Sequence, residues 1–410
     1  MNRPINSLLM LLIILIALIS VGCTSDKTSG NIIQFWHFWS EPAQKEVLLK
    51  LISEFEKEND CKVTLTELSW NDGKTKLMAA FNSQVAPDVL ELGSDWVAQF
   101  SSANVLMQLD PDTIGINNFI DISLAPATWE EKIYAIPWVV DTRVLFYNKD
   151  LMSNSGLDTL PPENYSQLLK MANIINNPTK NIYGFGANGS DPHRLYKKIL
   201  PLFWTFGGDV FDSSGNPVFN SVNNIEALKT YAQLSRTGII ETQRQIDSYF
   251  AQGKIAFVIS GAWLMKKIEN TNLGMQYGVA LMPRYLDQGI SFLGGEYLAI
   301  NGASQKKHLA MKLIKFLSDG KNSLELAKNF DEAGFPADKK YFKDPFFANN
   351  HNKKIFAEQL EFARPTPVHS KWLDIEAILE EAVTEAIYGT KTEMQALNEA
   401  QVKVLKLVNE

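Results

Sequence analysis

Short apolar strands alternate with amphipathic helices in the segment that follows residue 30, and this alternation restricts the fold more than any other feature. Strand-like runs cover residues 31–36, 62–68 and 86–92, while helical spacing of apolar residues covers 41–59 and 71–84. Parallel strands need a crossover, usually a helix, and such crossovers are right-handed. This order therefore predicts an α/β protein with a mostly parallel sheet.

The rest of the chain continues this pattern and is too long for one ordinary domain. Its 410 residues suggest two or three domains. Helical spacing recurs at 163–175, 194–206 and 222–238, and strand-like runs recur at 254–260 and 296–300. Hydrophobic residues make up 45% of the chain, which is enough for a full-sized core in each domain.

The first 31 residues have the layout of a secretion signal and a linker. Arg3 gives a short basic start, and residues 8–19 form an unbroken apolar run that is too short for a membrane span. Small residues then lead to Cys23, which resembles the acylated cysteine of bacterial lipoprotein signals. We predict a signal peptide at 1–22, a lipid anchor on Cys23 and a flexible tether over 23–31. A plain secretory peptide is the alternative.

Charge and cysteine content exclude several classes of protein. The formal net charge of −7 argues against an electrostatic nucleic-acid binder. Apart from Cys23 the only cysteine is Cys61, so no disulfide is expected, and the five histidines are scattered, so no metal site is expected. We also expect no cofactor. The phosphate-binding motif GxxxxGKS/T is absent, so an ATPase would have to be a separate chain.

Aromatic rings and polar residues occur together at six places, several of them at the ends of predicted strands. They are WHFWSE (36–41), ELGSDW (91–96), PWVVDTR (137–143), SGAWL (260–264), LGGEY (293–297) and ARPTPVHSKW (363–372). In open α/β sheets, ligands bind beyond the carboxyl ends of strands. Aromatic rings pack on the C–H faces of a pyranose, and Asp, Glu and Arg bind its hydroxyls. The clusters therefore indicate a carbohydrate site.

Each aromatic residue also has a purely structural interpretation. A single tryptophan at a strand end more often belongs to the core than to a ligand site, so the six clusters carry weight only together. Successive side chains of a strand point to opposite faces. In the first cluster we therefore expect Trp36 and Phe38 in the core, and His37 and Trp39 toward a cleft.

The same motifs resemble the extracellular solute-binding proteins of family 1, the sugar-binding components of ABC importers, and are similar to the maltose-binding type. The matching segments are FWHFWSEPAQ (35–44), APDVLELGSDWV (86–97), KIYAIPWVVDTRVLFYNKDLM (132–152), AQGKIAFVISGAWL (251–264), YGVALMP (277–283) and FLGGEYLAI (292–300). The resemblance covers essentially everything after the tether.

This resemblance implies the two-lobed, type II periplasmic-binding-protein fold, in which a ligand is caught between the lobes. Each lobe would be a mostly parallel sheet flanked by helices. The first lobe would comprise residues 31–140 and 297–335, and the second lobe would comprise residues 141–296 and 336–410.

The resemblance also implies which residues contact the ligand. Asp141 lies where the maltose type has a carboxylate, and Trp263 matches a stacking tryptophan of the family. Asp141 and Arg143 could instead form a structural ion pair. Glu296 could instead fix the backbone at the hinge. The expected contacts are His37, Trp39, Ser40, Glu41, Asp95, Trp96, Asp141, Arg143, Trp204, Trp263, Glu296 and Trp372, with His193 and Arg194 as weaker candidates.

The implied function is capture without catalysis. The lobes would close on a mono- or oligosaccharide and deliver it to an ABC permease that is driven by a separate ATPase. The protein would be a monomer anchored at the outer face of the cell membrane. Two alternatives stay open: a glycoside hydrolase that uses Asp95, Asp141 or Glu296, and a sugar-sensing binder that docks on a receptor.

Overall fold

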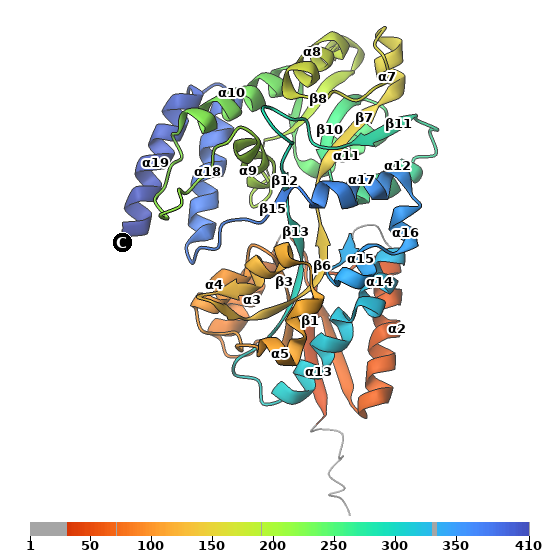
Figure 1. Ribbon diagram of the computed structural model, residues 1–410, viewed down its shortest axis with the longest axis vertical. Coiled ribbons are helices and arrows are strands. Elements are labelled where there is room, and N and C mark those ends of the chain that lie inside the picture. Colours follow the sequence, from red (N-terminus) through yellow and green to blue (C-terminus); the bar gives the residue numbers. More distant parts are fainter. Residues whose placement is uncertain (1–30, 71, 190, 330–333, 410) are drawn as a thin grey trace, which may run out of the picture.

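The computed structural model describes residues 31–70, 72–189, 191–329 and 334–409. In this part of the chain, two lobes are stacked along the long axis of the molecule, and each has its own central sheet (Figure 1). Strands β6 and β13 lie in the region where the lobes meet (Figure 1). The predicted signal peptide, the lipid anchor on Cys23 and the tether up to residue 30 fall outside the described residues.

The sheet of the first lobe has the strand order β14-β6-β13-β3-β1-β2. β1 pairs in parallel with β2 and β3, as the β-α-β-α-β pattern predicts. The pairings of β13 with β3 and of β6 with β13 and β14 are antiparallel, so this sheet is mixed rather than mostly parallel. The bounds are β1 (Ile32–His37), β2 (Lys62–Glu67), β3 (Val89–Gly93), β6 (Ala135–Asp141), β13 (Gly294–Ile300) and β14 (Phe335–Pro336).

Helix α2 (Pro42–Asn59) follows β1 and fixes the loop between them. Gln44 Oε1 accepts a hydrogen bond from the backbone N–H of Glu41 at 3.0 Å, and Pro42 occupies the first turn, where its missing N–H costs nothing. The helix buries one apolar face, formed by Val47, Leu48, Leu51, Ile52 and Phe55. Other helices of this lobe are α3 (Gly73–Asn82), α4 (Val97–Ser102), α5 (Pro111–Ile114), α6 (Leu124–Ala127), α13 (Lys307–Ser318) and α14 (Gly320–Asn329).

The sheet of the second lobe has the order β11-β7-β10-β8-β9 and is also mixed. β8 pairs in parallel with β9 and β10, whereas β7 pairs antiparallel with β10 and β11. The bounds are β7 (Val144–Asn148), β8 (Tyr183–Asn188), β9 (Gly238–Glu241), β10 (Ile255–Ser260) and β11 (Tyr277–Ala280).

Helices cover this second sheet, and the C-terminal pair lies beside α9 and α10 at the left of the view (Figure 1). α18 packs on α9, α10 and α19, so the end of the chain belongs to the second lobe. The bounds are α7 (Lys149–Asn154), α8 (Tyr165–Ile175), α9 (Tyr196–Thr205), α10 (Val222–Arg236), α11 (Gln243–Ala251), α12 (Trp263–Glu269), α18 (Trp372–Ile387) and α19 (Glu393–Asn409).

The chain passes between the lobes three times. It leaves the first lobe where β6 runs into β7, and returns where β12 (Ser291–Phe292) runs into β13. Helices α15 (Lys339–Phe342) and α16 (Pro345–Ala348) follow β14; α15 packs on α14 and β14, whereas α17 (His351–Leu360) packs on β7 and β11. The third passage therefore lies between α16 and α17, beyond the boundary expected at residue 336. Strand β15 (Ala363–Arg364) then pairs with β12.

Close packing of backbones marks the place where β13 enters the first lobe. Gly295 has φ +142°, and a Cβ atom there would lie 2.3 Å from the carbonyl oxygen of Val139. The pairing with β6 also shifts register between Glu296 and Tyr297. A residue other than glycine would be strained and would clash at this point, so the position of the Glu296 side chain depends on Gly295.

No helix in the described part of the chain is long and apolar enough to cross a membrane. Apolar side chains fill an extensive core in each lobe. Trp372 is 2% exposed and belongs to the core of the second lobe, where its ring packs edge-on against Tyr196 at 5.7 Å.

Candidate ligand-binding cleft between the lobes

A cavity of about 640 Å³ lies between the lobes and is lined by both of them. Its first-lobe wall comes from the segments after β1, β2 and β3, and its second-lobe wall comes from the start of α9 and α12 and from the loop after β8. Nine of the sequence-derived contacts line this single cavity: Trp39, Ser40, Glu41, Asp95, Trp96, Asp141, Arg143, Trp263 and Glu296. The weaker candidates His193 and Arg194 line it as well.

Three of the sequence-derived contacts do not line this cavity. His37 is 1% exposed and packs against the ring of Phe35 at 5.6 Å, and burial lowers the pKa of His37 to about 4. Within β1, His37 lies on the same buried face as Phe35, whereas Trp36 on the opposite face is only half-buried, so the predicted faces of these two residues are wrong. Phe38 follows the strand and is buried, as expected, but it also lines the cavity. Trp372 is a core residue of the second lobe.

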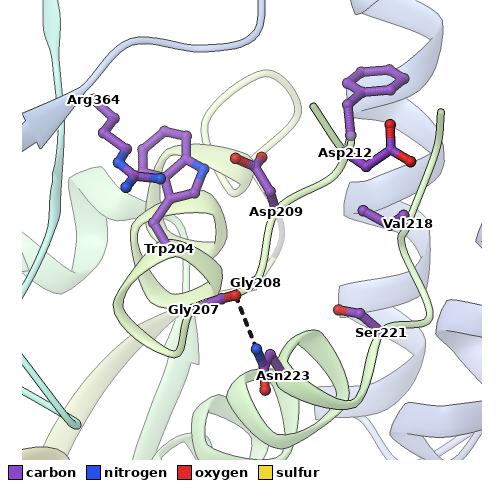
Figure 2. A pocket seen from close by; sticks show the side chains of 10 residues that line it. Trp204, Gly207, Gly208, Asp209, Asp212, Val218, Ser221, Asn223 and Arg364 are labelled. Carbon is purple, nitrogen blue, oxygen red and sulfur yellow. Dashed lines mark hydrogen bonds between the residues drawn. The ribbon is translucent and has the colours of Figure 1, made fainter. Parts of the chain in front are cut away.

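Trp204 lines a separate hollow of about 430 Å³ on the second lobe (Figure 2). Asp209, Ser221 and Arg364 lie around the same hollow, and Asn223 Nδ2 donates to the carbonyl oxygen of Gly207 at 2.9 Å at its rim (Figure 2). All the lining residues belong to segments of the second lobe, so this hollow is not part of the space between the lobes.

Buried carboxyl groups meet where β3 and β6 end and β13 begins, next to the cavity. Burial raises the pKa of Glu296 well above its ordinary value, and the nearby carboxyl groups of Glu91 and Asp141 raise it further. Glu91 Oε2 accepts a hydrogen bond from the backbone N–H of Phe38 at 2.8 Å. Because adjacent buried carboxylates repel one another, Glu296 holds its proton more tightly than an ordinary glutamate does.

Asp95 forms an electrostatic contact between the lobes. Its side chain is almost fully buried, and Lys197 Nζ of helix α9 lies 4.0 Å from its Oδ1. Burial alone would raise the pKa of Asp95, but Lys197 and Lys74 outweigh burial and hold the pKa below its ordinary value. Asp95 is therefore a carboxylate at neutral pH, and its charge favours the approach of the second lobe.

Arg143 lies at the hinge between Asp141 and Trp263. Its Nη1 is 2.6 Å from Asp141 Oδ2, and its guanidinium carbon lies 4.6 Å from the centroid of the Trp263 ring. The structural ion pair that we considered for Asp141 and Arg143 is therefore present. Both residues nevertheless line the cavity, so they are also placed to contact a ligand.

The Trp263 indole is held by a buried carboxylate. Its Nε1 donates to Asp247 Oδ2 at 2.8 Å, while Gln243 Nε2 and Ser260 Oγ donate to Asp247 Oδ1. Gly261 is needed here, because a Cβ atom at this position would lie 2.0 Å from the Trp263 ring. The ring therefore has a fixed orientation at the second-lobe wall.

Several acceptor atoms at the cavity are buried and have no hydrogen-bond partner among the described residues. They are Asp141 Oδ1, Glu296 Oε2 and Asn188 Oδ1, and each belongs to a residue that lines the cavity. Buried polar atoms normally have a partner, and leaving one without a partner costs about 1–3 kcal/mol. A ligand that brings several hydroxyl donors would supply the missing partners.

The sequence matches the profile of the bacterial extracellular solute-binding proteins over residues 39–322, which is more than half of the chain. The chain belongs to this family. Its membership agrees with the two-lobed fold, and the family name describes proteins that act outside the cytoplasm.

Known sugar binders are among the relatives of this solute-binding protein. The galactooligosaccharide-binding protein of Bacillus subtilis is 28% identical over 88% of this chain and 86% of its own length. The maltodextrin-binding protein MdxE of Bacillus subtilis is 24% identical over 89% of this chain and 88% of its own length. The structure of maltose-bound MalE3 of T. maritima superposes with a TM-score of 0.79 at 26% identity, covering 92% of this chain and 99% of that one.

Sequence reasoning missed several residues that line the cleft of this solute-binding protein. Trp70 follows β2, the same kind of position as the other clusters, but we did not count it among them. Lys197 and Lys198 are visible in the sequence only as basic residues near the start of a helix. Lys198 Nζ donates to the carbonyl oxygen of Ile259 at 2.8 Å, and burial, assisted by Arg143, lowers the pKa of Lys198 to about 7.

Proposed function

We propose that this solute-binding protein captures a saccharide between its lobes and delivers it to the permease of an ABC importer. The observation that carries the proposal is the single cavity to which both lobes contribute aromatic rings and buried polar groups. The ATPase that drives such an importer would be a separate chain.

The chemistry of the cavity walls matches a saccharide. Trp39, Trp70 and Trp96 of the first lobe face the cavity, and Trp263 faces it from the second lobe. Aromatic faces accept the C–H side of a pyranose, and the unpartnered acceptor atoms accept hydrogen bonds from its hydroxyls. Pockets that combine such walls with a few placed polar groups are typical of small-molecule sites. The sugar ligands in the names of the relatives support the same assignment.

Binding would favour closure because the ligand contacts both walls at once. The lobes already attract each other through Lys197 and Asp95, and a saccharide adds contacts that only a closed form completes. A ligand shifts a conformational equilibrium by its difference in affinity for the two forms. The permease would then recognise the closed form.

We further propose that the mature protein is a monomer attached to the outer face of the cell membrane through a lipid on Cys23. The apolar run at residues 8–19 and the small residues before Cys23 support this assignment. Metabolic labelling with a radioactive fatty acid tests it: the label should enter the wild type and be absent from Cys23→Ala. Equal labelling of both would contradict the anchor.

A thermal-shift screen against mono- and oligosaccharides tests the proposed ligand class. A saccharide at one hundred times its Kd stabilises the folded state by about 2.7 kcal/mol, so the midpoint of unfolding should rise by a few degrees with at least one sugar. A panel in which no sugar raises the midpoint would contradict the proposal.

Recovery of the sugar separates binding from hydrolysis. Glu296, with its raised pKa, lies near Asp141, and such a pair could be interpreted as the acid and nucleophile of a glycosidase. The comparisons favour neither that alternative nor a receptor-docking sensor. After prolonged incubation with the protein, the stabilising oligosaccharide should be recovered intact by chromatography, and shorter products would support the hydrolase.

A further inference from the structure

Buried charged groups from both lobes lie together behind the wall of the cleft. Lys74 of α3 and Asp95 belong to the first lobe, whereas Glu376 of α18 belongs to the second (Figure 1). Lys74 Nζ, Asp95 Oδ2 and Glu376 Oε2 are buried, and none of them has a hydrogen-bond partner in the part of the chain that the structure describes. Most buried polar atoms in folded proteins are paired, so three unpaired charged groups are unusual.

These three groups are close enough to affect one another electrostatically. Burial lowers the pKa of Lys74 to about 8, and the carboxyl groups of Asp95 and Glu376 oppose that decrease. Burial raises the pKa of Glu376, and His193 and Lys74 oppose that increase. Lys74 Nζ also lies 5.2 Å from the centroid of the Trp96 ring, which keeps the ammonium group beside this cluster. A cation of the first lobe is therefore a neighbour of a buried carboxyl group of the second lobe.

Lys74 and Glu376 do not line the cavity, so neither is placed to contact a ligand in it. Each of them nevertheless contacts a residue that does line it: Lys74 lies over the ring of Trp96, and Glu376 bonds to the ring of His193. Hinge bending that opens the cleft would separate Lys74 from Glu376, because they lie on different lobes, and water would then solvate both. Their mutual attraction is therefore strong only in the closed form.

We propose that Lys74 and Glu376 form an electrostatic latch between the lobes, which sets the affinity for every ligand without touching any of them. In the closed form the ammonium group of Lys74 offsets the buried carboxyl groups of Glu376 and Asp95, which would otherwise oppose closure. A change in the equilibrium between open and closed forms alters all affinities by the same factor, because it changes the population of the form that binds. This inference rests on the proposed function, since it assumes that the lobes close on a ligand.

Calorimetric titration of the mature chain with glucose, maltose, maltotriose, galactose and β-1,4-galactobiose tests the latch. Lys74→Met replaces the ammonium group by an apolar end of similar length. It should weaken the binding of each sugar that binds by the same factor, about tenfold. The matched control is Lys76→Met on the same helix. Its exposed ammonium group pairs with Asp72 at 2.8 Å, and its loss should leave every affinity unchanged.

A double-mutant cycle identifies Glu376 as the partner of Lys74 even if only one sugar binds. In a Glu376→Gln background, Lys74→Met should weaken binding by a clearly smaller factor than it does in the wild type, because part of the attraction is already lost. Denaturant unfolding of ligand-free Lys74→Met should match that of the wild type, because the ammonium group is solvated in the open form.

Three results would overturn the latch and leave the proposed function intact. They are unequal losses among the sugars that bind, equal factors in the two backgrounds of the cycle, and a loss of stability with unchanged affinities. Unequal losses would indicate a ligand contact, and a loss of stability alone would indicate a purely structural role. Failure of every saccharide to bind would overturn both the latch and the proposed function.

Discussion

Glu380 of helix α18 holds the chain segment from which several cavity residues project. Its carboxylate accepts hydrogen bonds from the backbone N–H groups of His193 at 3.0 Å and of Tyr196 at 3.2 Å. Glu376, one turn earlier, is fully buried and bonds to the His193 ring. Burial raises the pKa of Glu380 to about 7, against the lowering effect of the two backbone donors.

This raised pKa predicts how stability depends on pH. The folded state binds the proton of Glu380 more tightly than the unfolded chain does, so protonation of Glu380 stabilises the fold. This contribution to the free energy of unfolding is complete below the unfolded pKa of about 4.5 and is lost as pH rises through about 7. Glu380→Gln should therefore lose less stability than the wild type between pH 4.5 and 7 in denaturant unfolding. The exposed neighbour Glu381→Gln is the control, and parallel pH profiles of wild type and Glu380→Gln would refute this role.

Individual cavity residues could be predicted where a local motif marks them. Trp263 and Asp95 were accessible from short motifs next to predicted strands, and both line the cavity. The prediction placed His37 at the cleft because it took the wrong face of β1 as buried: His37 lies on the same buried face as Phe35, whereas Trp36 on the other face is only half-buried. Asp247 was not predicted. It accepts the hydrogen bond of the Trp263 indole, but the two residues lie 16 positions apart in the chain, and only folding brings them together.

The pairing of α11 with α12 through Asp247 sets the orientation of the Trp263 ring. Asp247 is buried and accepts hydrogen bonds from three donors, those of Gln243, Ser260 and Trp263. Asp247→Asn would place an amide donor against these donors. We expect a loss of about 2–3 kcal/mol in the free energy of unfolding and weaker saccharide binding.

Chemical denaturation and calorimetry measure the two effects of Asp247→Asn. Asp150→Asn is a suitable control, because this exposed carboxylate accepts a single backbone hydrogen bond, from Gln276 at 2.9 Å. The control should change stability by less than about 1 kcal/mol. If both variants behaved alike, Asp247 would not position Trp263 as we describe.

Strand β13 depends on Gly295 at the point where it crosses into the first lobe. Gly295→Ala should destabilise the protein by at least about 2 kcal/mol, because the added Cβ atom is both strained and within 2.3 Å of the Val139 carbonyl oxygen. Gly274→Ala is the control, since its φ of +66° imposes strain but no atom lies within 4 Å of the added Cβ. Thermal unfolding compares them, and equal losses would exclude the clash as the cause.

At the scale of elements, the alternation of strands and helices predicts the parallel part of the first sheet correctly. The same alternation cannot predict the pairing of the crossing strands, because Gly294 pairs with Asp141 across about 150 residues of chain. Local patterns carry no information about such partners. The resemblance to a known family supplied the crossings, and the packing of α15 and α17 places the last of them later than expected.

At the scale of the molecule, the two walls of the cavity carry opposite charges. The wall formed by the first lobe and its crossing strands carries Glu41, Asp95 and Asp141, and the second-lobe wall carries Arg143, Arg194 and Lys197. Complementary charges bring the lobes together in register. The sequence shows each of these residues but not that they converge, because convergence depends on the crossings.

A crystal structure of the complex with the most stabilising saccharide would show directly whether a sugar binds between the lobes. The sugar should lie between the lobes, with a ring beside Trp263 and hydroxyls within about 3.2 Å of the carboxyl oxygens of Asp141 and Glu296. A saccharide seated instead in the hollow beside Trp204, with nothing between the lobes, would contradict the proposed binding between the lobes.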